Sequence, residues 1–109
     1  MKPIDPQGAI ETMWDLAPKY ATAKAERVYM EEFRKSKKAL LMRQYTDLPL
    51  GGQEREAYAD PEYIGLLVAL KVAVEAEETL RWRLVSTQAA VDVWRSQNAS
   101  NRQIDRAAQ

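Results

Sequence analysis

Apolar residues recur at helical spacing along most of the chain, and no segment alternates as a β-strand would. At the start, Asp5 followed by Pro6 is typical of a helix cap with proline at the first helical position. The apolar side chains that follow predict a short helix over residues 6–16. Pro18 should end or kink it, because proline lacks the backbone N–H that a helix interior uses.

A long helix is predicted over residues 18–47, because no Gly or Pro interrupts residues 19–48. Proline and glycine then cluster at the start of a connector, residues 48–60, in which residues 53–59 could form one or two helical turns. The best apolar stripe of this helix consists of Ala25, Tyr29, Phe33, Leu40 and Leu41.

A second long helix is predicted over residues 61–97. Asp60-Pro61-Glu62 is the clearest start signal in the chain, since Asp caps, Pro fits the first position and Glu favours the positive end of the helix dipole. The polar tail, residues 98–109, is expected to fray. The apolar stripe of this helix consists of Tyr63, Leu66, Leu67, Leu70, Val74, Leu80, Leu84, Val91 and Trp94.

These elements predict an all-α fold: a long, coiled-coil-like antiparallel αα-hairpin with a short N-terminal helix, in a single helical domain over residues 1–109. The second long helix has a further apolar face, and a two-helix hairpin buries only one stripe of each helix. We therefore expect a homo-oligomer, with a monomeric three-helix bundle as the alternative. The predicted oligomer interface consists of Val68, Val72, Trp82, Val85, Ala89 and Val93.

Four polar residues interrupt the stripes: Glu26, Lys37, Gln44 and Glu77. Polar groups in a helical seam can fix the register or the oligomeric state. Alternatively, their long side chains reach the rim of the seam and stay hydrated, which is the interpretation that we favour.

The composition excludes several classes of activity. The 109 residues include no Cys and no His, so disulfides, zinc–thiolate sites and histidine-based acid–base chemistry are absent. No glycine-rich phosphate loop is present, and we expect a non-enzymatic protein without metal or cofactor. Residues 1–6 show no signal peptide, and the longest run free of polar side chains, residues 64–70, is too short to span a membrane. A cytoplasmic location is expected.

The formal net charge of zero hides a strong segregation of charge along the chain. Residues 19–43 carry a net charge of +5, residues 47–78 of −6 and residues 79–109 of +3. In an antiparallel hairpin the basic run at residues 34–38 is expected to meet Glu75, Glu77 and Glu78. Such exposed pairs contribute about 0–1 kcal/mol each.

Basic residues also gather at the open end of the predicted hairpin, together with Trp82 and Trp94. Cations that hold phosphates beside rings that stack on bases are typical of proteins that bind single-stranded nucleic acid. We expect Trp94 to be a core residue, whereas Trp82 could serve an interface or a ligand. The candidate nucleic-acid-binding residues are Lys19, Lys24, Arg27, Lys35, Lys37, Lys38, Arg81, Arg83, Arg95 and Arg102.

Several segments resemble small helical-hairpin proteins encoded near phage recombination genes. They are Arg34 to Leu41, Glu56 to Ala59, Asp60 to Tyr63, Leu80-Arg81-Trp82, Val93 to Ser96 and Asn101-Arg102. In layout the chain is similar to the UvsY-type recombination mediators of phages. The resemblance implies an oligomer that binds single-stranded DNA and helps to load a recombinase in place of a single-strand-binding protein. It places Lys35, Lys37 and Lys38 on the corresponding basic helix.

Two other functions remain open from the sequence. One is a protein–protein interaction module without nucleic-acid binding, such as an inhibitor or adaptor of a host complex, with the acidic residues 54–62 as its contact surface. The other is a structural coiled-coil spacer.

Overall fold

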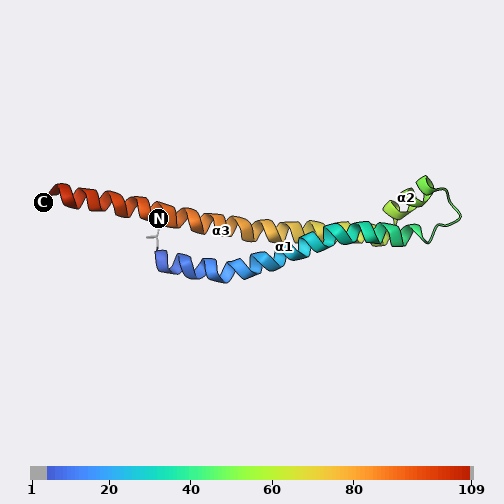
Figure 1. The fold of residues 1–109 in the computed structure, drawn as a ribbon, viewed down its shortest axis with the longest axis horizontal. Helices are drawn as coiled ribbons and strands as arrows, with labels where there is room; N and C mark the ends of the chain where they lie inside the picture. Colours follow the sequence, from blue (N-terminus) through green and yellow to red (C-terminus); the bar gives the residue numbers. More distant parts are fainter. Residues whose placement is uncertain (1–4, 109) are drawn as a thin grey trace. The chain divides into compact units, whose positions relative to one another are not determined.

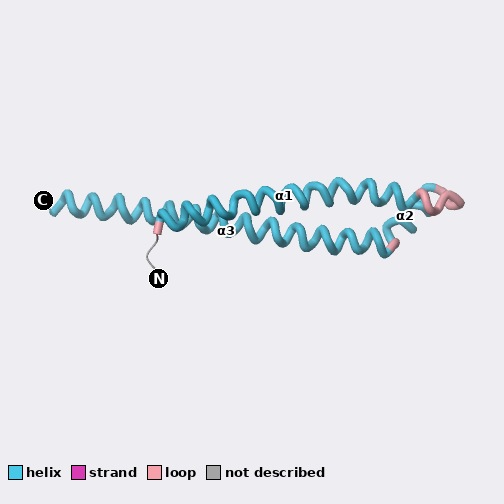
Figure 2. Tube along the Cα trace, turned by 90° about the horizontal axis from the view of Figure 1, so that it is seen from below, coloured by secondary structure: helices cyan, strands magenta, loops and turns pink. Residues whose placement is uncertain are grey.

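The structure, a computed structural model, describes residues 5–108. The segment 1–4, on which the expected absence of a signal peptide partly depends, lies outside the described residues. The described chain forms three helices, α1 (Pro6–Met42), α2 (Leu50–Ala59) and α3 (Pro61–Ala108), and no strand (Figure 1). Short loops separate the helices (Figure 2). The all-α hairpin predicted from the sequence is therefore confirmed.

Helix α1 runs through Pro18 without a break, so the predicted separate helix over residues 6–16 is wrong. Asp5 caps this helix as expected, because its Oδ1 accepts a hydrogen bond from the Gln7 N–H at 3.2 Å. Pro18 lies inside this helix and is exposed. Leu16 before it and Ala23 after it are buried, so α1 packs against α3 on both sides of the proline (Figure 1).

The connector differs from the prediction at both ends. Helix α1 ends at Met42 rather than at residue 47, and the chain then turns through hydrogen bonds such as that from the Gln44 N–H to the Leu41 carbonyl, at 3.0 Å. Helix α2 includes Gly51 and Gly52, which were expected to break helices. They are tolerated because they lie in the first turn, directly after the extended Pro49, where few backbone bonds depend on them.

Helix α3 begins at Pro61 as predicted, and Asp60 Oδ1 accepts the Glu62 N–H at 2.8 Å. It continues to Ala108, so the expected fraying after residue 97 is wrong. No Gly or Pro follows Gly65, and the end of the chain is rich in Ala, Gln and Arg, which are good helix formers. The residues of this last segment are almost all exposed.

The contacts divide the described residues into two compact units. Residues 5–20 and 79–108 form one, and Ala21–Glu78 forms the other. In each unit a part of α1 lies beside a part of α3 (Figures 1 and 2). Leu41, Ala57 and Tyr63 form the core of the Ala21–Glu78 unit, where all three helices meet.

Within each unit, the parts of α1 and α3 face each other through positions that alternate three and four residues apart, as in a coiled coil. We call these positions the seam. On α1 the seam consists of Met13, Leu16, Tyr20, Ala23, Arg27, Met30, Arg34, Lys37 and Leu41, all buried or half-buried. On α3 it consists of Tyr63, Leu66, Leu70, Ala73, Glu77, Leu80, Leu84, Thr87, Val91 and Trp94, again buried or half-buried.

The stripe predicted for α3 largely coincides with this seam, although Leu67 and Val74 are exposed. The stripe predicted for α1 is wrong. Only Leu41 is buried, whereas Tyr29 and Leu40 are exposed. The reason is that three seam positions of α1 are occupied by the cationic side chains of Arg27, Arg34 and Lys37, whose aliphatic stems can pack against apolar neighbours.

Candidate functional site: a basic and aromatic pocket

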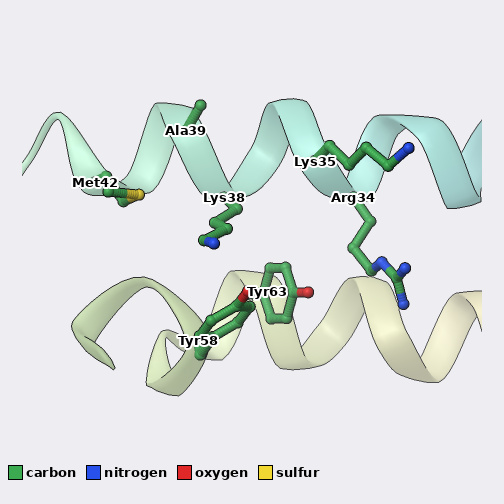
Figure 3. A pocket seen from close by; sticks show the side chains of 7 residues that line it. All are labelled: Arg34, Lys35, Lys38, Ala39, Met42, Tyr58 and Tyr63. Atoms are coloured by element: carbon green, nitrogen blue, oxygen red, sulfur yellow. The ribbon is translucent and has the colours of Figure 1, made fainter. Parts of the chain in front are cut away.

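A pocket of about 630 Å³ opens in the Ala21–Glu78 unit, where all three helices contribute (Figure 3). Helix α1 supplies its basic side chains, α2 supplies Tyr58 and α3 supplies Tyr63. Figure 3 shows Arg34 and Lys38 extending from α1 toward the facing helices, whereas Lys35 runs along α1. The complete lining consists of Arg34, Lys35, Lys38, Ala39, Met42, Tyr58 and Tyr63.

The two tyrosines lie on opposite sides of a one-residue joint between α2 and α3. Asp60 has an extended backbone (φ −66°, ψ 133°), and this turns the start of α3 away from the axis of α2. As a result the rings of Tyr58 and Tyr63 meet edge to face, with centroids 5.3 Å apart and an angle of 73° between their planes. Tyr63 is buried and fixed, whereas Tyr58 is 48% exposed and presents part of its ring to solvent.

Lys38 lies over the Tyr58 ring, with its Nζ 4.6 Å from the ring centroid. The same Nζ is 3.2 Å from Glu54 Oε1 on α2. A hydrogen bond with the Tyr58 side chain, followed by the bond to Glu54, raises the pKa of Lys38 above its ordinary value. Lys38 therefore keeps its positive charge at the mouth of the pocket throughout the physiological pH range.

Arg34 is the least engaged cation of the pocket. It is half-buried, and within residues 5–108 it makes no hydrogen bond or ion pair with another side chain. Lys35 contacts Glu32 at 3.3 Å, but both side chains are highly exposed and such a pair contributes little. Two of the three cations can thus accept an anionic ligand without losing a buried partner.

The other predicted nucleic-acid-binding residues of this unit are mostly engaged elsewhere. Arg27 is held by Glu77 and Glu31 in the seam, and the hydrogen bond to Glu77, followed by that to Glu31, raises its pKa. Lys37 contacts Glu62 at 3.0 Å. Only Lys24 is exposed without a hydrogen bond or ion pair to the described residues.

These contacts also correct the expected register of the charge pairs. The basic run was expected to meet Glu75, Glu77 and Glu78, but Lys37 pairs with Glu62 and Lys38 with Glu54. The chain folds back sooner than predicted, so that Leu41 lies level with Tyr63. The preference for hydrated polar groups at the seam is also wrong for Glu77, which is only 5% exposed and bonded to Arg27.

The remaining predicted cations belong to the unit formed by residues 5–20 and 79–108. Lys19 pairs with Asp15 at 3.1 Å, and the Arg81 guanidinium lies 4.6 Å from the Trp82 ring centroid. Three further arginines are exposed: Arg83, Arg95 and Arg102. The structure therefore joins Lys35 and Lys38 with Arg34, Tyr58 and Tyr63, three residues that the sequence interpretation did not select.

A local signal for this site exists in the sequence. Arg34 and Lys38 are four residues apart and thus share a helix face, and Tyr58 and Tyr63 flank an Asp-Pro pair that joins two helices. The angle between α2 and α3 completes the pocket, and the sequence pattern does not give that angle.

The residues predicted as an oligomer interface are all exposed. Val68 and Val72 lie in the Ala21–Glu78 unit, each 59% exposed. Trp82, which is 55% exposed, belongs to the unit formed by residues 5–20 and 79–108. There it lines a surface hollow together with Thr12 and Leu16 of the same unit. The remaining members are Val85, Ala89 and Val93. Their contact with a second copy stays a prediction.

Residues 5–108 contain no cluster of acidic side chains that could hold a metal ion. Over the same range, no helix combines the length and the apolar character needed to cross a membrane. Comparison of the chain with family models, curated proteins and solved structures finds no match.

Proposed function

We propose that the chain is a non-enzymatic accessory protein of DNA recombination or replication that binds single-stranded DNA through the basic and aromatic pocket. The observation that carries this proposal is the composition of the pocket. Three cations and two tyrosine rings line one cavity, and no carboxylate is among the lining side chains.

Each part of a nucleotide has a suitable partner in this pocket. The planar guanidinium of Arg34 suits two oxygens of a phosphate, and Lys35 adds a second charge. The exposed part of the Tyr58 ring offers a surface on which a base can stack, an interaction of about 1–3 kcal/mol. The volume of about 630 Å³ lies within the range of small-ligand sites.

A single strand fits this arrangement better than a duplex. In a duplex the bases are stacked on each other, so a tyrosine ring on the protein surface cannot stack on their faces. In a single strand one base can turn out of the stack and enter the pocket. The resemblance to UvsY-type mediators suggests that recombinase loading is the process served, with several copies of the site acting on one strand.

The test is fluorescence anisotropy with a labelled single strand of about 40 nucleotides, titrated from about 50 mM salt upward. Binding that weakens steeply with salt is expected. Arg34→Glu should weaken it strongly, whereas Arg55→Glu, the same charge change at an exposed position of α2 outside the pocket, should have a small effect. Absence of binding at low salt, or equal losses in both variants, would contradict the pocket as the site.

A protein–protein interaction module is the second candidate, because many large apolar side chains are exposed, among them Val68, Val72 and Trp82. Glu54 and Glu62 contact Lys38 and Lys37, so we place such a partner on the apolar faces rather than on the acidic residues 54–62. This alternative predicts no salt-dependent DNA binding.

A further inference from the structure

One side of the Ala21–Glu78 unit is largely apolar on both long helices, although α1 also carries Glu26 and Ser36 there. On α1 it carries Tyr29, Phe33 and Leu40, of which Tyr29 is 67% and Leu40 49% exposed. The rings of Tyr29 and Phe33 are stacked, with centroids 5.9 Å apart and planes 6° from parallel. The α3 residues of this side are Glu62, at the start of the helix, and then Gly65, Ala69, Val72 and Ala76.

The seam shows that these residues share a side. On α1, Phe33 lies four positions before the seam residue Lys37. On α3, Ala69 likewise lies four positions before the seam residue Ala73. In two antiparallel helices, positions with the same relation to the seam flank it on the same side. The other unit follows this rule. Thr12 and Arg83, which lie four positions before Leu16 and Thr87, line one hollow.

The two helices contribute opposite shapes to this side. Helix α1 offers large side chains, whereas α3 offers mostly small ones. At Gly65 an added Cβ would meet no atom within 4 Å, so the backbone of α3 is open to a neighbour there. A surface with protruding rings on one helix and shallow positions on the other is complementary to itself when turned by a two-fold rotation.

The charges support the same pairing. Within this unit, α1 carries six basic and three acidic residues, and α3 carries one basic and four acidic residues. The helices therefore have net charges of +3 and −3. When two copies meet, α1 of one is attracted to α3 of the other, whereas pairing of α1 with α1 would bring like charges together.

We propose that this side binds a second copy of the chain, with α1 of each copy packed antiparallel on α3 of the other around a two-fold axis parallel to the helices. Because Leu41 lies level with Tyr63 and Arg27 with Glu77, Phe33 falls level with residues 69–72. Phe33 then packs on the partner's Ala69. The pairing does not use the pocket and is independent of DNA binding.

Disulfide formation between two single-cysteine chains tests this geometry, since the natural chain has no cysteine. Phe33→Cys and Ala69→Cys chains, carrying tags of different size, are mixed and oxidised. We expect the mixed disulfide between the Phe33→Cys and Ala69→Cys chains to form much faster than the disulfide between two Phe33→Cys chains. The matched control is the pair Val28→Cys and Val74→Cys on the opposite side of the unit, where both natural side chains are more exposed than Phe33 and Ala69. Faster linkage in the control pair, or preferred self-linkage of Phe33→Cys, would overturn the proposal.

Sedimentation equilibrium provides the second measurement. The natural chain should be dimeric or larger, and Phe33→Glu should lower its mass to that of a monomer while helicity by circular dichroism is retained. Val28→Glu should leave the assembly intact. A monomeric natural chain at micromolar concentration would overturn the proposal. If Phe33→Glu fails to fold, the disulfide experiment tests the interface instead.

Discussion

Arg27 and Glu77, fifty residues apart in the chain, form two hydrogen bonds across the seam: Arg27 Nε donates to Glu77 Oε2 at 2.6 Å and Nη2 donates to Oε1 at 2.9 Å. The third nitrogen, Nη1, donates to Glu31 Oε2 at 3.0 Å. The pair joins α1 to α3 through a carboxylate that is almost completely buried. Its geometry is that of the strong, two-pronged arginine–carboxylate contact.

Glu77→Ala should therefore destabilise the fold. The substitution removes two charge-assisted hydrogen bonds and leaves a half-buried guanidinium with fewer acceptors, so we expect a loss of about 1–3 kcal/mol in the free energy of unfolding. Urea denaturation followed by circular dichroism measures this loss. The control is Glu32→Ala, which removes an exposed partner of Lys35 and should change stability by less than about 0.5 kcal/mol. Equal effects would show that the buried pair is not important for stability.

Two adjacent leucines allow a test of the core. Leu41 is 1% exposed and packs with Ala57 and Tyr63, whereas Leu40 is 49% exposed. Leu41→Ala should cost about 2–5 kcal/mol because it leaves a cavity. Leu40→Ala should leave the stability of the monomer nearly unchanged and instead weaken self-association. Thermal melts at two protein concentrations separate these effects, and a large loss for Leu40→Ala that does not depend on concentration would contradict the assignment.

The Lys38 contacts predict a pH dependence with a definite sign. The pKa of Lys38 is raised in the folded state above its ordinary value of 10.5, so its bonds to Tyr58 and Glu54 contribute fully below pH 10.5 and are lost as the pH rises through the raised value. Lys38→Met should lower the free energy of unfolding at neutral pH, and the difference from the natural chain should shrink at about pH 11 and above. Lys35→Met, which removes an exposed ion pair, should have nearly the same free energy of unfolding as the natural chain at either pH. If the loss of stability in Lys38→Met grew with pH, the charge of Lys38 would not be the source of the stabilisation.

Tyr58 should contribute to DNA binding through its ring rather than its hydroxyl. Tyr58→Ala is expected to weaken the binding of a single strand by roughly 5- to 150-fold, which corresponds to about 1–3 kcal/mol, whereas Tyr58→Phe should retain most of the affinity. Anisotropy titrations at one fixed salt concentration measure both variants. A larger loss for the Phe variant than for the Ala variant would show that stacking is not the basis of binding.

The sequence predicts the features of this fold that depend on local interactions. Asp60-Pro61 places the start of α3 correctly, because capping involves only neighbouring residues. The α3 stripe is also largely correct, since most of its seam is apolar. The α1 stripe is not, because Arg27, Arg34 and Lys37 occupy seam positions and a search for apolar residues passes over them.

Features that depend on distant partners could not be obtained in this way. Glu77 is buried because Arg27 lies opposite it, and neither residue alone indicates the other. The pocket likewise depends on the angle between α2 and α3 at Asp60, which brings Tyr58 beside Tyr63. Its basic residues were partly predicted, but the aromatic half of the site was not.

The buried arginine–carboxylate pair also determines how α1 and α3 can be aligned. A coiled-coil repeat permits one helix to slide along the other by seven residues with little change in its apolar contacts. Such a slip would bring Arg27 opposite Leu70 or Leu84 and separate it from Glu77, so its guanidinium would face leucine and keep only Glu31, on its own helix, as an acceptor. The pair thus selects one alignment against its two nearest competitors, and the segment between Met42 and Pro61 needs only to be long enough to reach it.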